Sequence, residues 1–170
     1  MNVFFKSLTI VISLFLTACA SVEMAENNAD ISAKKFLPPP DGKASLYIYR
    51  NEIFGNTITK QVLLNGIVIG ETAGQTYFHL NLQPGRYFIA SPAGRSLFLE
   101  SGTTGGRNTT IDLQGGKTYF VWQEIKAGGP AWLQIVNETT GKQGVKESEL
   151  IALQLDAGDL RPSASSATGK

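Results

Sequence analysis

The stretch Gln61–Glu71, "QVLLNGIVIGE", contains two short apolar runs separated by Asn65-Gly66. Asparagine and glycine tolerate the positive φ angles of a type I′ turn, so this stretch predicts a tight β-hairpin. Similar runs rich in Tyr, Phe, Val, Ile and Leu follow one another from Ala44 onward, with Gly, Pro and Asn between them. They recur at roughly 8 to 12 residues, which is typical of an all-β fold.

We therefore predict an antiparallel β-sandwich of about eight short strands, with the folded domain spanning residues 44–155. Residues 145–155, in which Leu150 and Leu153 are three positions apart, are compatible with a short C-terminal helix. Residues 156–170 are polar and predicted to be disordered. Besides the hairpin, the predicted strands are 45–50, 76–82, 86–91, 95–101, 108–113, 117–124 and 131–137.

Several short motifs, in the same order along the chain, resemble those of a family of small Gram-negative envelope lipoproteins catalogued as a domain of unknown function. The resemblance covers about residues 44–150 and implies an antiparallel β-sandwich. It implies no catalytic residues. The motifs are Tyr-x-Tyr-Arg at 47–50, Asn-Gly at 65–66, Thr-Tyr-Phe at 76–78, Leu-x-Pro-Gly-x-Tyr at 82–87 and Gly-Lys-Thr-Tyr-Phe at 116–120.

The N-terminus has the pattern of an export signal over residues 1–18. Lys6 gives it a positive start, residues 7–16 are apolar, and small residues follow. The apolar stretch is too short to span a bilayer, which requires about 20 residues. Cys19, the only cysteine, comes directly after Leu-x-Ala and resembles the lipobox of bacterial lipoproteins, in which the thiol is lipidated.

This resemblance implies a chain anchored durably by lipid on Cys19, because several acyl chains bind a membrane far more tightly than one. Ala20 follows the cysteine, where aspartate would favour the inner membrane. We therefore expect the protein in the outer membrane, facing the periplasm. Residues 19–43 are polar and contain Pro38-Pro39-Pro40, so we predict a tether that holds the domain clear of the membrane.

Charge argues against nucleic acid as a partner. The chain has 15 basic and 14 acidic residues, and loss of Lys6 with the signal leaves the mature protein balanced. No cluster of Lys and Arg interleaved with aromatic residues occurs anywhere in the sequence. With one histidine and a cysteine assigned to lipid, we also expect no metal and no cofactor.

Enzyme chemistry has little support in the sequence. His79 is the only histidine, it falls within a predicted strand, and no Gly-x-Ser-x-Gly motif accompanies it. Glu100, Asp112 and Glu124 could supply a carboxylate pair if the fold brought two of them together. A small envelope hydrolase that uses His79 or such an acidic cluster is therefore the alternative function.

Both faces of some predicted strands are apolar. Tyr47 and Tyr49 oppose Leu46 and Ile48, although a two-sheet sandwich buries only one face of each sheet. The second face must be roofed by the tether or the C-terminal segment, which we favour, or bind a carbohydrate or protein partner. Our preferred function is a non-enzymatic binding or scaffolding domain. Its candidate contacts are Tyr47, Tyr49, Arg50 and Trp122.

Overall fold

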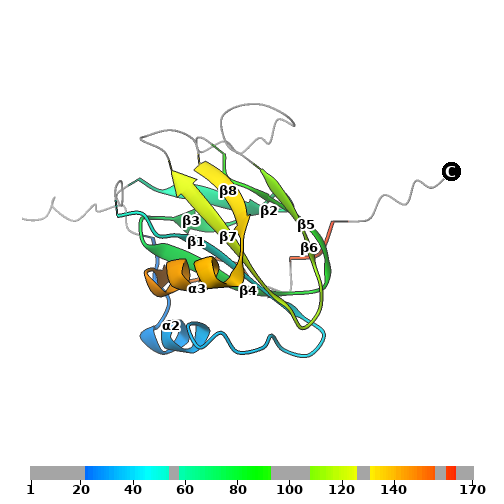
Figure 1. Cartoon of the computed structure of the whole chain (residues 1–170). Helices are drawn as coiled ribbons and strands as arrows, with labels where there is room; N and C mark the ends of the chain where they lie inside the picture. The colour runs from blue at the N-terminus through cyan, green and yellow to red at the C-terminus, as the bar shows by residue number, and fades with distance from the viewer. Residues whose placement is uncertain (1–21, 54–57, 93–107, 126–130, 156–159, 164–170) are drawn as a thin grey trace, which may run out of the picture.

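Two β-sheets packed face to face form the body of the protein in this computed structural model, which describes residues 22–53, 58–92, 108–125, 131–155 and 160–163 (Figure 1). The predicted sandwich is confirmed, although the predicted strand 95–101 lies outside the described residues. The five-stranded sheet has the order β8 (Ala131–Val136), β7 (Thr118–Ile125), β1 (Ala44–Arg50), β4 (Thr76–Leu82) and β9 (Glu149–Leu150). The four-stranded sheet has the order β3 (Ile67–Thr72), β2 (Lys60–Leu64), β5 (Gly85–Ala90) and β6 (Thr109–Leu113).

The hairpin between β2 and β3 forms as predicted. Asn65 and Gly66 both have positive φ angles, of 51° and 84°, as a type I′ turn requires. The Asn65 side chain also accepts a hydrogen bond from the backbone N–H of Phe88 at 2.7 Å. This bond ties the turn to the neighbouring strand β5 and fixes the register of the sheet.

The five-stranded sheet is mixed rather than antiparallel. β1 pairs antiparallel with β4 but parallel with β7, and β4 pairs parallel with β9. The expectation of a purely antiparallel sandwich is wrong for these two pairings. Alternation of apolar residues shows which face a side chain occupies, but it does not show the direction of a neighbouring strand that is distant in sequence.

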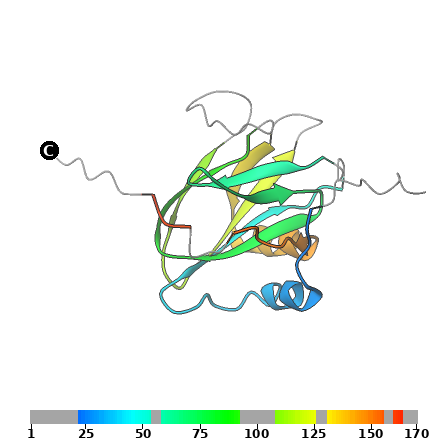
Figure 2. The same cartoon turned by 180° about the vertical axis from the view of Figure 1, so that it is seen from behind.

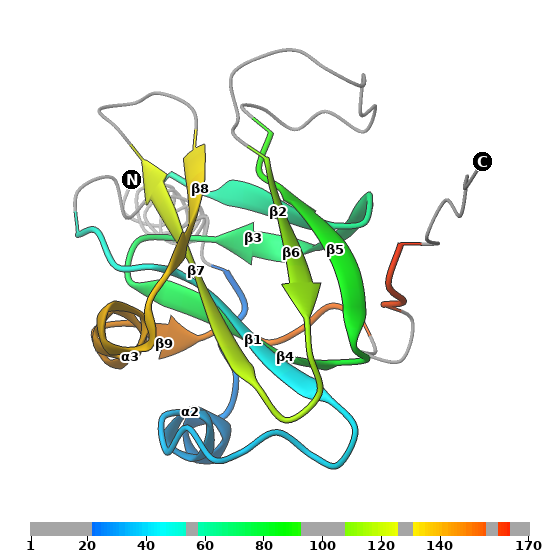
Figure 3. The ribbon, with the colours of Figure 1, turned by 45° about the vertical axis from the view of Figure 1, so that its right-hand side comes forward.

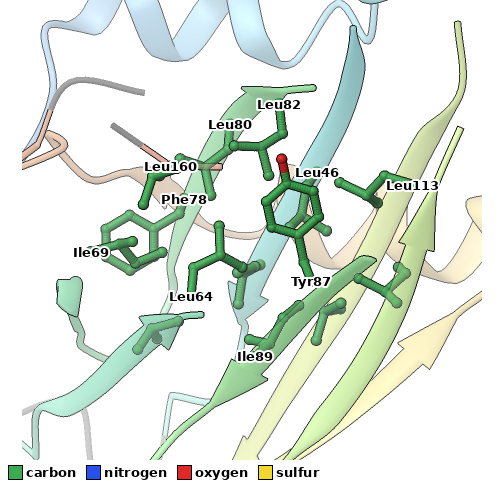
Figure 4. Close-up of a cluster of buried hydrophobic side chains, with 14 of the residues drawn as sticks. Leu46, Leu64, Ile69, Phe78, Leu80, Leu82, Tyr87, Ile89, Leu113 and Leu160 are labelled. Carbon is green, nitrogen blue, oxygen red and sulfur yellow. The ribbon is translucent and has the colours of Figure 1, made fainter. Parts of the chain in front are cut away.

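The main core lies between the two sheets and is mostly aliphatic. Figure 4 shows Leu46, Phe78 and Leu80 of the five-stranded sheet pointing toward Leu64 and Ile89 of the other sheet. The alternation in β1 places Leu46 and Ile48 in this core, as the strand period predicts.

Part of the C-terminal tail belongs to this core, contrary to the prediction of disorder over 156–170. Leu160 is only 4% exposed and packs among the core side chains (Figure 4). The backbone N–H of Ser163 donates to the carbonyl of Arg86 at 2.9 Å. A single apolar residue in a polar stretch gives no periodic signal, so this contact could not be predicted from composition.

Two helices cover the outer face of the five-stranded sheet (Figure 3). α2 (Asn27–Ala33) and α3 (Glu138–Lys146) enclose a second, aromatic core there. The outer face is therefore roofed, as we favoured. The buried members of this aromatic core are Ala33, Tyr47, Tyr49, Tyr77, Phe120 and Val145.

A short helix near the C-terminus is present, as predicted, but it lies earlier in the chain. The expected range of 145–155 is wrong, because α3 ends at Lys146 and residues 149–150 form β9. Asn137 caps α3, accepting a hydrogen bond from the backbone N–H of Thr140 at 2.9 Å. This helix was not predicted from the sequence because it contains Gly141 and Gly144, and glycine disfavours helices. The spacing of Leu150 and Leu153 was a misleading helical signal.

The predicted tether is largely packed onto the domain. Figure 2 shows the blue segment passing beside the sheets, through α2 and along their lower edge into β1. Met24 forms a β-bridge with Ile151, and Ala33 is buried. The prediction of a free tether over 19–43 is therefore wrong for residues 22–36, and the folded unit begins well before Ala44.

Candidate functional site

A hollow of about 360 Å³ opens between α3 and the ends of strands β1 and β7. We call it the α3 pocket. Its size falls within the range of small-molecule sites, and its walls combine aromatic, hydroxyl, amide and carboxylate groups. The lining residues are Tyr49, Asn51, Trp122, Thr139, Thr140, Gln143, Gly144 and Glu147.

The aromatic wall is made by two of the four predicted contact residues. Tyr49 of β1 and Trp122 of β7 are partners in the parallel register, so their side chains lie next to each other on the outer face. Tyr49 is nearly fully buried, whereas Trp122 is partly exposed. Burial, together with the negative charges of Glu147 and Glu52, raises the pKa of Tyr49 to about 12, so this hydroxyl stays protonated at neutral pH.

The indole of Trp122 carries an unused hydrogen-bond donor. Its Nε1 is buried, and no hydrogen-bond acceptor for it occurs among the described residues. A buried donor without an acceptor costs about 1–3 kcal/mol. Because this atom is buried, a ligand in the α3 pocket would contact other atoms of Trp122.

The polar wall is held in place by Glu147, just after α3. Its carboxylate accepts hydrogen bonds from Nδ2 of Asn51 at 2.8 Å and from Nε2 of Gln143 at 3.0 Å. These bonds hold the pKa of Glu147 below its ordinary value. The pocket therefore carries a fixed negative charge, and the described residues that line it include no Lys or Arg.

The other two predicted contacts are structural. The Tyr47 hydroxyl donates to the carbonyl of Ala33 at 2.9 Å, and its ring lies under the N-terminal segment. Arg50 has no exposed surface, and its guanidinium donates to the carbonyl of Ile58 at 2.6 Å and lies 3.6 Å from Glu52. Neither side chain is available to a partner in this structure.

Of the alternative catalytic group, the described members His79, Asp112 and Glu124 have separate surroundings. His79 stacks on Tyr47 with ring centroids 4.3 Å apart, and burial lowers its pKa to about 4, so it is neutral at pH 7. Asp112 pairs with Arg86 on the other sheet, and Glu124 accepts from Gln134. Glu100 lies outside the described residues, as does the lipidation candidate Cys19.

A second hollow, of about 450 Å³, lies where the N-terminal segment crosses the open side of the sandwich. Val22 and Glu23 form one wall, Thr59 and Gln61 belong to the β2 side, and Ile151 follows β9. The remaining lining residues are Val68, Gly70, Glu71, Ala152 and Gln154.

In the described part of the chain, no group of three or more His, Cys, Asp and Glu side chains is arranged to hold a metal ion. None of the helices in that same part has the length and apolar composition needed to cross a bilayer.

Sequence reasoning missed the polar half of the α3 pocket. Asn51 lies more than 90 residues before Gln143 and Glu147 in the chain. The three side chains meet only because α3 folds back over β1. The Asn137 cap was the one local signal that could have placed this helix.

Comparison with known proteins assigns the family. Residues 40–135 match the family described as "Protein of unknown function (DUF2846)". The chain belongs to this family. An uncharacterized protein of Haemophilus influenzae is 32% identical over 149 residues, covering 86% of this chain and 83% of that protein. No solved structure matches. The DUF2846 match includes Tyr49, Asn51 and Trp122 and ends before α3.

Proposed function

We propose that this DUF2846 protein is a lipoprotein that binds an envelope ligand in the α3 pocket without catalysing a reaction. Lipid on Cys19 anchors it in the outer membrane, and the β-domain faces the periplasm. The export signal, the Leu-x-Ala-Cys pattern and Ala20 support the anchor and its location. Cys19→Ser removes the anchor, so the variant should leave the membrane fraction while keeping the native circular dichroism spectrum. A variant that still sediments with outer membrane would contradict the anchor.

The observation that carries the binding role is the aromatic wall of the α3 pocket. Tyr49 and Trp122 are neighbours in the strand register, and both line the pocket together with hydroxyl, amide and carboxylate groups. An aromatic wall beside polar groups suits a ligand that has both hydrogen-bonding groups and an apolar face.

The ligand is a neutral carbohydrate. Glu147 gives the α3 pocket negative charge, and no cation lies among the described lining residues, which disfavours phosphates and other anions. Asn51, Gln143 and the hydroxyls of Thr139 and Thr140 offer both donors and acceptors at the rim. A sugar ring matches this set, because its hydroxyls both donate and accept while its C–H face can lie on an aromatic ring.

The hydrolase alternative lacks a comparable observation. His79 is stacked against Tyr47, and its lowered pKa leaves it a poor base at neutral pH. The described carboxylates Asp112 and Glu124 each interact with a different partner on a different sheet.

Intrinsic fluorescence tests the proposed site. In a Trp132→Phe background, Trp122 is the only tryptophan, and titration with a panel of neutral oligosaccharides should change its emission. Trp122→Ala removes half of the aromatic wall, so the dissociation constant, measured by calorimetry, should rise about tenfold. Asp112→Asn, on the other sheet, is the matched control and should bind normally. Saturation by peptides instead of sugars, or equal affinity of Trp122→Ala, would contradict the proposal.

A further inference from the structure

The segment from residue 22 to residue 36, which we call the strap, is bound to the sheet edge by backbone hydrogen bonds. Ala25 N–H donates to the carbonyl of Leu150 at 2.9 Å, and Ala152 N–H donates to the carbonyl of Glu23 at 2.9 Å. With the bridge between Met24 and Ile151, these bonds add a short extra strand beside β9. The strap thereby covers an otherwise open sheet edge.

Asp30 locks the helical part of the strap. Its Oδ1 accepts hydrogen bonds from the Tyr77 hydroxyl and from the backbone N–H of Leu150, each at 2.9 Å. Its Oδ2 pairs with Nζ of Lys34 at 2.7 Å. One carboxylate therefore joins α2, β4 and β9.

Aromatic packing holds the far end of the strap. Phe36 lies over the outer face, with its ring 5.5 Å from Tyr47 and 6.1 Å from Phe120 between centroids. Together with the hydrogen bond from Tyr47 to Ala33, this contact makes the strap part of the folded domain. It cannot act as a spacer while these contacts persist.

The free spacer between anchor and domain is consequently very short. Val22 is already bound at the sheet edge, and three peptide units separate it from Cys19, a span of at most about 11 Å. On the basis of the proposed lipid anchor, we propose that the domain sits directly on the lipid surface, with the end that carries Val22 and Ile151 facing the membrane.

The surface at this end suits a lipid bilayer. Met24, Ile53 and Ile58 are 39%, 70% and 41% exposed. They belong to the same end, since Arg50 binds the carbonyl of Ile58 and Val22 shares a hollow with Thr59. Exposed apolar side chains bind to the interfacial region of a bilayer. Glu23 adds negative charge at this end, whereas Glu52 is paired with Arg50, so the surface fits zwitterionic lipids better than anionic lipids.

The strand register shows which residues lie at each end of the domain and how far apart the two ends are. Arg50 pairs with Thr76, which in turn pairs with Glu149, at the membrane end, whereas Ala44 pairs with Leu82 at the opposite end. The seven residues of β1 span about 20 Å. Glu149 and Lys117 are exposed, and they lie at the membrane end and the opposite end respectively.

Energy transfer to the membrane measures this orientation. The mature lipoprotein has no other cysteine, so Glu149→Cys and Lys117→Cys each provide one thiol for a donor dye. The full-length lipidated protein is placed in phosphatidylcholine–phosphatidylethanolamine vesicles that carry an acceptor dye on the headgroups. Transfer should be roughly twofold higher from position 149 than from position 117, since about 20 Å separates the two ends.

Two changes to the strap sharpen the test. A Gly/Ser insertion of about 20 residues after Ser21 adds an average reach of about 25 Å, and it should lower transfer from both positions and remove their difference. Asp30→Ala deletes both Oδ1 hydrogen bonds and should lower transfer from position 149. Asp30→Asn keeps an oxygen at that place and should retain the native value.

The outcomes separate this inference from the anchor. Protein that remains bound to vesicles but shows equal transfer from both positions would overturn the orientation and leave the proposed anchor intact. Unchanged transfer after the insertion would do the same. If the native protein carries no lipid and does not bind vesicles, while Cys19→Ser behaves identically, both proposals are wrong. Weaker binding to anionic than to zwitterionic vesicles would support the lipid preference, and the reverse would contradict it.

Discussion

The two faces of the five-stranded sheet are buried in different ways. The inner face is covered by the second sheet and packed mainly with aliphatic side chains such as Leu46 and Ile48. The outer face is covered by the strap and α3, from opposite ends of the chain, and packed with aromatic side chains such as Tyr47 and Phe120. The inner core depends on strand pairing, whereas the outer core depends on two separate segments. The outer core therefore forms only when both of these segments are docked on the sheet. The α3 pocket lies within this outer core.

Among the changes considered, deletion of residues 22–43 should have the largest effect on the stability of the outer core. The deletion removes Phe36 and Ala33 and exposes Tyr47, Tyr77 and Phe120 to water. Because each aromatic side chain gains about 1.5–3 kcal/mol from burial, the free energy of unfolding should fall by more than about 3 kcal/mol. Urea denaturation followed by circular dichroism measures the change.

Deletion of residues 19–21 alone is the matched control for the strap. It leaves every strap contact in place and should not change the denaturation midpoint. If the version that begins at Ala44 is as stable as this control, the outer core does not need the strap.

Acid should weaken the outer face through His79. Burial lowers the pKa of this residue from 6.5 to about 4 in the folded protein, so the unfolded chain binds its proton more readily. The stability associated with neutral His79 is complete above about pH 6.5 and is lost as the pH falls toward 4, with a total of about 3 kcal/mol. Urea unfolding at several pH values measures this slope.

His79→Gln separates this effect from that of the carboxylates. The variant keeps a polar side chain beside Ser45 but cannot titrate. Its free energy of unfolding should depend less on pH between 6.5 and 4 than that of the native protein. Identical slopes would show that His79 is not buried as described.

The same comparison explains how much of the fold could be predicted from the sequence. Period-two alternation and the Asn65-Gly66 turn predicted the sandwich and its inner core, because both signals are local. The strap and α3 gave no such signal. Asp30 finds its partners on β4 and β9 only in the folded chain, and α3 contains two glycines that lower its helix propensity.

Only two of the four predicted contact residues belong to the α3 pocket, for a related reason. Trp122 and Tyr49 stood out because apolar residues occupied both faces of their strands, and the structure places them together in the α3 pocket. Tyr47 and Arg50 belonged to the same motif, but the strap covers the first and the second has no exposed surface. A strand pattern identifies a face and cannot show which part of that face another segment covers.

The smallest expected effect concerns the contact between α3 and the sheet. A Cβ on Gly144 would overlap the ring of Tyr49, whereas a Cβ on Gly115 would meet only ordinary contacts, the nearest at 3.5 Å. Gly144→Ala raises helix propensity by up to about 1 kcal/mol but forces α3 away from the sheet, and overpacking costs about 1–3 kcal/mol. We expect a net loss of about 1 kcal/mol, a more exposed Trp122 with red-shifted emission, and no change for Gly115→Ala. A stabilised Gly144→Ala with unshifted emission would mean that α3 does not pack closely on Tyr49, and the α3 pocket would then lack the rigid wall on which its proposed ligand depends.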